Sequence, residues 1–148
     1  MIFIDITGQP CAGKSSFIEK EVMKSKRIYT YKKTFRKSLL YLFSGINYLG
    51  FQRTKVLLFW SLKENASFIF RINIFRNAVL KFGIFYNLEK LSQKDSQKTL
   101  VDEGLSHLPF LFLNTETKQV VDFISHELQN VNVWFLKSPE YDIIKSRL

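Results

Sequence analysis

Hydrophobic and polar positions along the chain follow two different periods. Short apolar runs of strand-like composition occur at residues 1–7 (MIFIDIT), 98–101 (KTLV) and 131–136 (VNVWFL), and residues 26–35 (KRIYTYKKTF) predict a further strand. Between these runs, apolar residues recur at steps of three and four, which is typical of helices that bury one face. Strands that alternate with helices predict an α/β fold with a mainly parallel sheet flanked by helices.

The helical segments are each predicted from an apolar stripe. A helix follows the first strand (KSSFIEKEVMK, with Ile18 and Val22 at helical spacing), and another begins near NTETKQ. The two stripes between the second and third predicted strands are expected to be core, and the last helix is expected to bury one face. The three stripes are Phe35, Leu39, Leu42, Ile46, Leu49; Phe68, Ile72, Phe75, Val79, Phe82, Tyr86; and Val120, Val121, Ile124, Leu128.

Length and composition predict one domain over residues 1–148. The chain is 46% hydrophobic, so it can bury a sizeable core. Its single cysteine, Cys11, allows no intrachain disulfide, and no signal-like segment precedes the first strand, so a cytoplasmic location is expected. The longest uncharged run, residues 38–52, has 15 residues, fewer than the roughly 20 that a transmembrane helix needs.

The net charge of +9 comes from one segment. Residues 22–63 carry ten Lys or Arg and no acid, whereas the remaining 12 basic residues are balanced by 13 acidic ones. Such a segment attracts a phosphorylated substrate, nucleic acid or an anionic membrane surface. The alternative is a solvated face that only keeps the protein soluble.

A phosphate-binding motif lies between the first strand and the first helix. Gly8, four residues, Gly13, Lys14 and Ser15 satisfy G-x-x-x-x-G-K-[ST]. Backbone N–H groups of such a loop point at phosphate oxygens, the lysine reaches the β- and γ-phosphates, and the serine hydroxyl is a Mg²⁺ ligand. The alternative is a Gly-rich turn with a helix-capping serine. Cys11 inside the loop is either a reactive thiol or, as we favour, a small filler.

A second acidic motif, TLVDEG, ends the third apolar run. Asp102 follows Thr99, Leu100 and Val101, as does the acid that holds Mg²⁺ through water in many nucleotide sites. Glu103 either polarises the attacking group or faces solvent at the strand end. His107 and His126 show no metal-ligand spacing, so neither is expected to bind a metal.

These motifs resemble the P-loop nucleoside and nucleotide kinase-like superfamily. The resemblance rests on GQPCAGKSS, TLVDEG and the closing VNVWFLKSPEYDIIKSR, and it covers the chain from the first strand to the end. It implies ATP and Mg²⁺ as cofactors, a metal site at Ser15 and Asp102, and phosphoryl transfer to a small, anionic acceptor. The implied catalytic residues are Lys14, Asp102, Glu103 and Arg147, and the implied nucleotide-binding residues are Gly8, Gln9, Pro10, Cys11, Ala12, Gly13, Lys14, Ser15 and Ser16.

Two departures from the superfamily pattern change these expectations. No acid occurs between Glu21 and Glu64, so Asp5 or Glu103 would have to orient the acceptor hydroxyl. Asp5 lies in a strand that should be buried, so it is either paired with a cation or functional, and we favour a structural role. The sequence also stops at Leu148, before a complete lid and before the usual adenine loop, so we expect a truncated or minimal fold with little preference between ATP and GTP.

Other nucleotide-binding classes fit less well. No N-K-x-D motif for guanine reading is present, and DEG lacks the D-x-x-G spacing of a GTPase switch. The leading hypothesis is therefore a small-molecule kinase, with candidate substrate anchors at Arg36, Arg53, Arg71 and Arg76. The alternative is an ATPase or an inactive nucleotide binder, in particular a nucleotide-regulated module whose segment 22–63 contacts nucleic acid or an anionic membrane.

Overall fold

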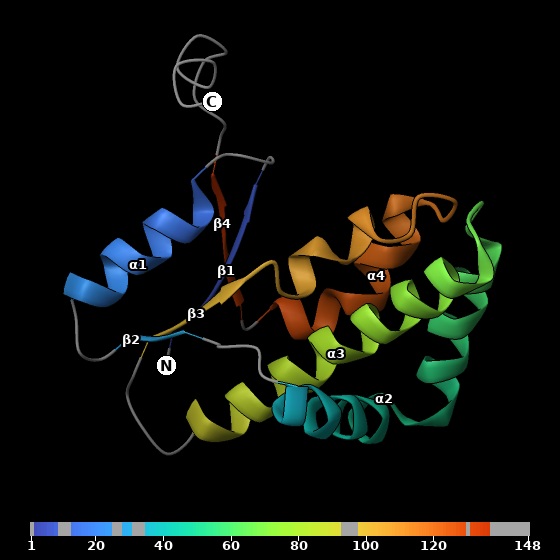
Figure 1. Cartoon of the computed structure of the whole chain (residues 1–148), viewed down its shortest axis with the longest axis horizontal. Coiled ribbons are helices and arrows are strands. Elements are labelled where there is room, and N and C mark those ends of the chain that lie inside the picture. The colour runs from blue at the N-terminus through green and yellow to red at the C-terminus, as the bar shows by residue number, and fades with distance from the viewer. Residues whose placement is uncertain are drawn as a thin grey trace, which may run out of the picture.

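A computed structural model describes residues 2–8, 13–24, 28–30, 35–92, 98–129 and 131–136 (Figure 1). Helices and strands alternate as the hydrophobic pattern predicts. In chain order the elements are β1 (Ile2–Gly8), α1 (Lys14–Lys24), β2 (Ile28–Thr30), α2 (Phe35–Lys63), α3 (Phe68–Ser92), β3 (Lys98–Asp102), the 3₁₀ helix η1 (Leu105–Phe110), α4 (Thr117–Leu128) and β4 (Val131–Leu136).

The strands form a parallel sheet in the order β2-β3-β1-β4. Ile6 on β1 is in register with Asp102 on β3, and Gly8 is in register with Leu136 on β4. Helix α1 covers one face of the sheet, and the helices α2, α3 and α4 lie on the opposite side (Figure 1). The predicted α/β class with a parallel sheet is confirmed.

Alternate residues of the two central strands enter two different hydrophobic clusters, because successive side chains of a strand point to opposite faces. Ile4, Ile6 and Leu100 pack with Ile18 of α1 on one face. Val101 faces the other way and joins the larger cluster built with α2, α3, η1 and α4. Both central strands are therefore buried on both faces, as expected for a parallel sheet between helices.

The helices α2 and α3 form a long antiparallel hairpin. Helix α2 is kinked at Gly50, whose backbone has φ 68° and ψ 176°. The two helices approach so closely that a Cβ at Gly83 would lie 1.7 Å from the carbonyl oxygen of Tyr41, and one at Gly45 would lie 2.2 Å from that of Val79. The pair of glycines therefore fixes where the helices cross.

The predicted core stripes are correct only in part. Leu49, Val79 and Phe82 are buried, and Val120 and Ile124 of α4 are buried as predicted. Four residues of the two hairpin stripes are instead exposed, so their assignment to the core was wrong: Leu39, Ile46, Phe68 and Ile72. Val121, expected on the same face of α4 as Val120, is exposed as well. The hairpin is apolar on several faces, so more than one stripe satisfies the helical period. The glycine crossing shifts the buried face of α3, which keeps Val79 and Phe82 and adds Ile74, Ala78 and Phe85.

Arg53 joins the hairpin to α4 through a buried ion pair. Its Nη1 lies 2.6 Å from Oε1 of Glu127, a residue with 1% of its surface exposed, and its Nη2 donates to the carbonyl oxygen of Phe123 at 2.7 Å. The Tyr48 hydroxyl donates to the same Oε1 at 3.1 Å. Burial disfavours the Glu127 carboxylate, but the hydrogen bonds it accepts and the charge of Arg53 together outweigh burial, so the pKa of Glu127 is lowered. Arg53 is therefore part of the fold, and not the substrate anchor that we expected.

Helices long and apolar enough to cross a bilayer are not found among the described residues.

Candidate functional site

The candidate site lies where the carboxyl ends of β1 and β3 meet. These strands are direct neighbours in the sheet, yet the chain leaves β1 toward α1 on one face and leaves β3 toward η1 on the other. Open parallel sheets bind ligands in the crevice formed where successive connections diverge in this way. The topology alone therefore brings both sequence motifs to the part of the sheet that favours a ligand.

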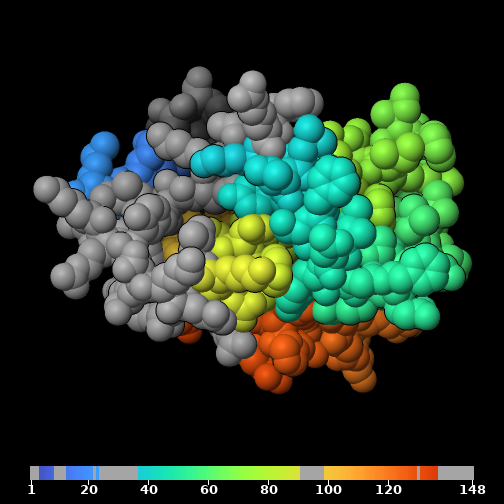
Figure 2. All heavy atoms as spheres, turned by 90° about the horizontal axis from the view of Figure 1, so that it is seen from below, coloured from blue at the N-terminus to red at the C-terminus, as the bar shows by residue number. Residues whose placement is uncertain are grey.

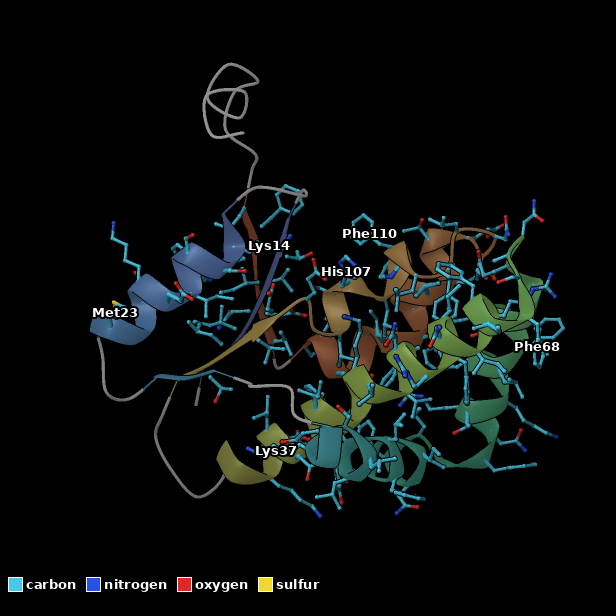
Figure 3. The ribbon with its side chains drawn as sticks, in the orientation of Figure 1. Lys14, Met23, Lys37, Phe68, His107 and Phe110 are labelled. Carbon is cyan, nitrogen blue, oxygen red and sulfur yellow. The ribbon has the colours of Figure 1, made fainter. Side chains whose placement is uncertain are left out.

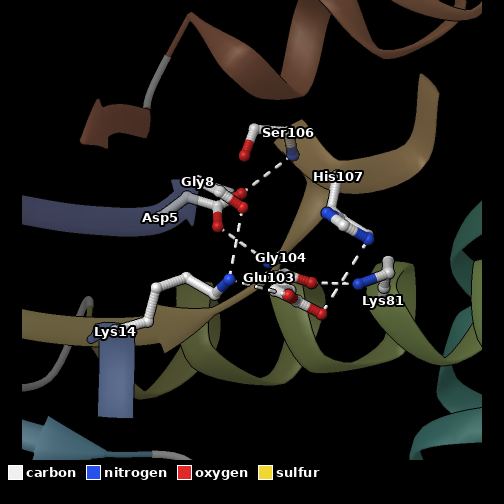
Figure 4. Close-up of polar contacts among 8 residues, drawn as sticks. All are labelled: Asp5, Gly8, Lys14, Lys81, Glu103, Gly104, Ser106 and His107. Atoms are coloured by element: carbon white, nitrogen blue, oxygen red, sulfur yellow. Dashed lines mark hydrogen bonds and ion pairs between the residues drawn. The ribbon is translucent and has the colours of Figure 1, made fainter. Parts of the chain in front are cut away.

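Lys14 is the first residue of α1 and reaches back across the end of β1. Gly13 has φ 79°, a left-handed conformation that favours glycine, and its carbonyl accepts the first helical hydrogen bond from the Phe17 N–H at 2.9 Å. The Lys14 ammonium donates to the Gly8 carbonyl at 3.2 Å and lies 3.3 Å from Oε1 of Glu103 (Figure 4). The two motifs, 89 positions apart, are therefore in direct contact through one ion pair.

Asp5 fixes the turn that follows β3. Its side chain is fully buried, and its two carboxylate oxygens accept the backbone N–H groups of Gly104 at 2.7 Å and Ser106 at 2.8 Å (Figure 4). The partners are thus backbone amides and not the cation that the sequence suggested. The carboxylate is sealed from solvent, so Asp5 positions the turn and is not available to orient an acceptor, which supports the structural role that we favoured.

Glu103 occupies the centre of the site. Its backbone has φ 52°, its N–H donates to the Ile6 carbonyl at 2.9 Å, and its own carbonyl accepts a hydrogen bond from the Lys81 ammonium. The side chain is 41% exposed, with one oxygen near Lys14 and the other 3.8 Å from Nε2 of His107. The turn therefore presents a carboxylate that is held at its backbone and open to solvent at its head.

The electrostatic environment shifts two pKa values at the site. Asp102 is exposed at the strand end, and the partial burial of its carboxyl, followed by the charge of Glu103, raises its pKa. Burial, followed by the positive charge of Lys81, lowers the pKa of His107, so its imidazole is neutral at pH 7. Neighbouring side chains whose pKa values are shifted from their ordinary values are typical of sites that bind charged ligands or transfer protons. A cation placed beside Asp102 would relieve the cost of its ionised form.

A cavity of about 370 Å³ opens beside these residues, between α3 and the turn after β3. Its polar lining comes from Asn77 and Lys81 of α3, from His107, and from Asp102 and Glu103. Apolar walls are supplied by Leu80, Ile84, Phe85, Val101, Leu105 and Leu111. Small-molecule sites combine a similar volume with apolar walls and a few convergent polar groups.

The structure brings together only part of the predicted site. Lys14, Glu103 and Asp102 share one electrostatic cluster, and Ser15 and Ser16 are exposed on the first turn of α1. Gln9, Pro10, Cys11, Ala12 and Arg147 lie outside the described residues. The Arg71 Nε donates to the Ala66 carbonyl at 3.0 Å, Arg76 is exposed, and the side chain of Arg36 is outside the described set.

Three cavity residues were missed from the sequence: Asn77, Lys81 and His107. His107 follows Glu103 by four positions, so the spacing DEGLSH could have suggested that they meet. Nothing in the sequence links Lys81 to Glu103, because the contact depends on how α3 packs against the sheet.

Three or more His, Cys, Asp or Glu side chains do not converge on a metal-binding position anywhere in the described ranges. Comparison with protein-family models, with curated proteins and with solved structures found no match.

Proposed function

We propose that this protein is a P-loop phosphotransferase that uses ATP and Mg²⁺ to phosphorylate a small, anionic acceptor. The observation that carries the proposal is the contact of Lys14 with both Gly8 and Glu103 at the adjoining ends of β1 and β3, beside a cavity. A lysine from a G-x-x-x-x-G-K-[ST] loop and an acid on the neighbouring strand are the parts from which such sites are built.

The phosphate end of the nucleotide would lie over the start of α1. The first backbone N–H groups of this helix have no intrahelical partner, and its N-terminus favours negative charge. The Lys14 ammonium contacts the Gly8 carbonyl and the Glu103 carboxylate, and it would exchange the carboxylate for a phosphate oxygen of the bound nucleotide. The exchange of one anionic partner for another keeps the lysine charge compensated throughout.

Ser15 and Asp102 would hold Mg²⁺ together with water and the phosphates. In phosphoryl-transfer sites this ion takes one or two protein oxygens and completes its octahedral shell from water and substrate. The raised pKa of Asp102 fits this role, because a divalent ion stabilises the ionised carboxylate that burial and Glu103 disfavour. Bound Mg²⁺ would neutralise charge that develops on the transferred group.

The acceptor would occupy the cavity beside Glu103. Lys81 and Asn77 offer donors to an anionic acceptor, and the apolar walls exclude water from part of the space. The Glu103 carboxylate lines this cavity and could accept the proton of an attacking hydroxyl, and the neutral His107 beside it offers a second proton acceptor. Glu103 is the better base candidate, since its backbone is fixed on both sides by Ile6 and Lys81.

A phosphoryl-transfer assay over a panel of nucleosides, sugars and their monophosphates tests this proposal. ADP release that requires one class of acceptor supports it, and Lys81→Ala should raise the KM for that acceptor more than it lowers kcat. Glu103→Gln, which keeps the shape and removes the base, should lower kcat by at least about 100-fold. If no acceptor accelerates ADP release above the rate with water, the kinase proposal is wrong and an ATPase or a nucleotide-binding module remains.

A further inference from the structure

The outer surface of the α2–α3 hairpin is unusually apolar. Twelve of its large hydrophobic side chains are exposed, over residues 39–72, and we call this set the hairpin surface: Leu39, Leu40, Phe43, Ile46, Phe51, Leu58, Phe59, Leu62, Phe68, Ile69, Phe70 and Ile72. Figure 2 shows α2 forming much of one face of the molecule, and Phe68 points outward at the far end of the hairpin in Figure 3. Exposed apolar patches of this extent mark interaction sites.

The charged residues of the hairpin are nearly all positive. Exposed cations lie among the apolar side chains at Lys37, Lys55, Lys63 and Arg76. Between Phe35 and Ser92 the sequence has two acids: Glu89, which is half-buried near the end of α3 and outside residues 39–72, and Glu64. Glu64 is buried, and its carboxylate accepts the backbone N–H of Asn114 at 3.0 Å. The hairpin surface therefore presents positive charge with no exposed acid to balance it.

Cations and rings alternate along the second half of α2. The Lys55 ammonium lies 4.5 Å from the ring centroid of Phe51, and the Lys63 ammonium lies 4.4 Å from that of Phe59. Both pairs are spaced by four residues, so rings and ammonium groups share one side of the helix. Such an arrangement allows the rings to enter an apolar layer while flexible lysines keep their charge at its edge.

We propose that the hairpin surface binds an anionic lipid bilayer. A bilayer with acidic headgroups offers an apolar boundary for the side chains and negative charge for the cations. A second copy of the chain fits poorly, since two such surfaces would repel each other. Nucleic acid fits the cations and the phenylalanines, but not the seven exposed leucines and isoleucines, which have no ring to stack on a base.

This surface is separate from the nucleotide site and its binding does not depend on the proposed function. None of its members lines the cavity beside Glu103. Two other hairpin cations have partners outside the hairpin, since Arg53 pairs with Glu127 and Lys81 donates to Glu103, whereas Arg71 donates to the Ala66 carbonyl between α2 and α3. Vesicle binding without nucleotide therefore tests it independently of any kinase activity.

The test is co-sedimentation with phosphatidylcholine vesicles and with vesicles that contain 30% phosphatidylserine, a composition chosen for the assay. We expect the protein to partition only into the anionic vesicles. The bound fraction should decrease when the salt is raised from about 0.05 to about 0.5 M, the two concentrations chosen for the assay, because salt screens the attraction between the cations and the headgroups. Lys55→Glu with Lys63→Glu should lower the partition coefficient by at least about 30-fold: roughly fivefold for each of the two lost cations, with repulsion of the two new carboxylates added. Phe51→Ser with Phe59→Ser should lower it at least about tenfold.

Matched controls use exposed residues of other elements. Met23→Ser, at the end of α1 and 85% exposed, and Lys118→Glu, on α4, should leave partition unchanged; Figure 3 places Met23 far from Phe68. The composition and salt comparisons use the wild type alone, so they stand even if a variant fails to fold. Equal partition into both vesicle types, or no partition, overturns the proposal. So does a wild type that dimerises or binds oligonucleotides through these residues while ignoring vesicles.

Discussion

Asp5→Asn replaces one oxygen of a buried carboxylate by an NH₂ group and removes half of the anchorage of the turn after β3. The carboxylate accepts two backbone N–H groups, from Gly104 and Ser106, and has no solvent exposure. The amide can accept only one of them, because its nitrogen is a donor. One backbone donor is then buried against another donor, whichever way the amide is turned.

The expected decrease in the free energy of unfolding of Asp5→Asn has two contributions. A hydrogen bond to a charged group contributes about 1.5–3 kcal/mol, and a buried donor left unpaired costs about 1–3 kcal/mol. Since the amide keeps one bond and these terms overlap, we expect a decrease of about 2–3 kcal/mol in the free energy of unfolding. The variant should also lose catalytic turnover, because the displaced turn carries Glu103.

Urea unfolding followed by circular dichroism measures the change. Asp122→Asn, the same substitution at an exposed position of α4, is the matched control and should stay within about 0.5 kcal/mol of the wild type. If Asp5→Asn and Asp122→Asn are equally stable, then Asp5 does not hold the turn after β3 and the positioning role assigned to it is wrong.

Three further substitutions test separate parts of the structure. Arg53→Ala leaves the Glu127 carboxylate buried without its partner, so the free energy of unfolding should fall by about 3–5 kcal/mol in urea titrations, whereas Arg76→Ala should change it by less than about 0.5 kcal/mol. His107 has a folded pKa below its ordinary value of 6.5, so the unfolded chain binds the extra proton and the stability falls as the pH drops through and below 6.5. His107→Phe should remove this part of the pH dependence, and an identical pH profile would contradict the assignment. Asp102 has a raised folded pKa, so its ionised form costs stability above the ordinary pKa of 3.8. At pH 7 Asp102→Asn should therefore unfold at no lower urea concentration than the wild type, while Mg²⁺-dependent transfer is lost; equal loss of nucleotide binding and turnover would make Asp102 structural.

The sequence predicts the sheet better than the helical hairpin. β1 and β3 are apolar runs that end in recognisable motifs, and parallel pairing then brings Gly8 and Asp102 to one edge without further information. Helices α2 and α3 are apolar on several faces, so a period of 3.6 does not select the buried one. Their packing is set by the close approach at Gly45 and Gly83, and no single helix reveals that approach.

The candidate site shows the same division. Lys14 and Asp102 follow from local motifs, whereas Lys81 enters the site only because α3 packs beside the turn after β3. Arg53 looked like a free cation in a basic segment, but it is paired with Glu127, which lies 74 positions away. Which residue pairs with Lys81 or with Arg53 depends on how distant elements pack together, and a single sequence carries no direct signal for such packing.

Calorimetric titration of MgATP into the wild type, Lys14→Ala and Lys20→Ala tests the central claim most directly. Lys20 is an exposed lysine of the same helix, so the pair differs in position and not in chemistry. The account predicts that the wild type and Lys20→Ala bind MgATP equally, and that Lys14→Ala, folded by circular dichroism, binds at least about tenfold more weakly because a charge-assisted contact is lost. Equal affinity in all three proteins, or no binding by the wild type, would contradict the assignment of a nucleotide site at the ends of β1 and β3.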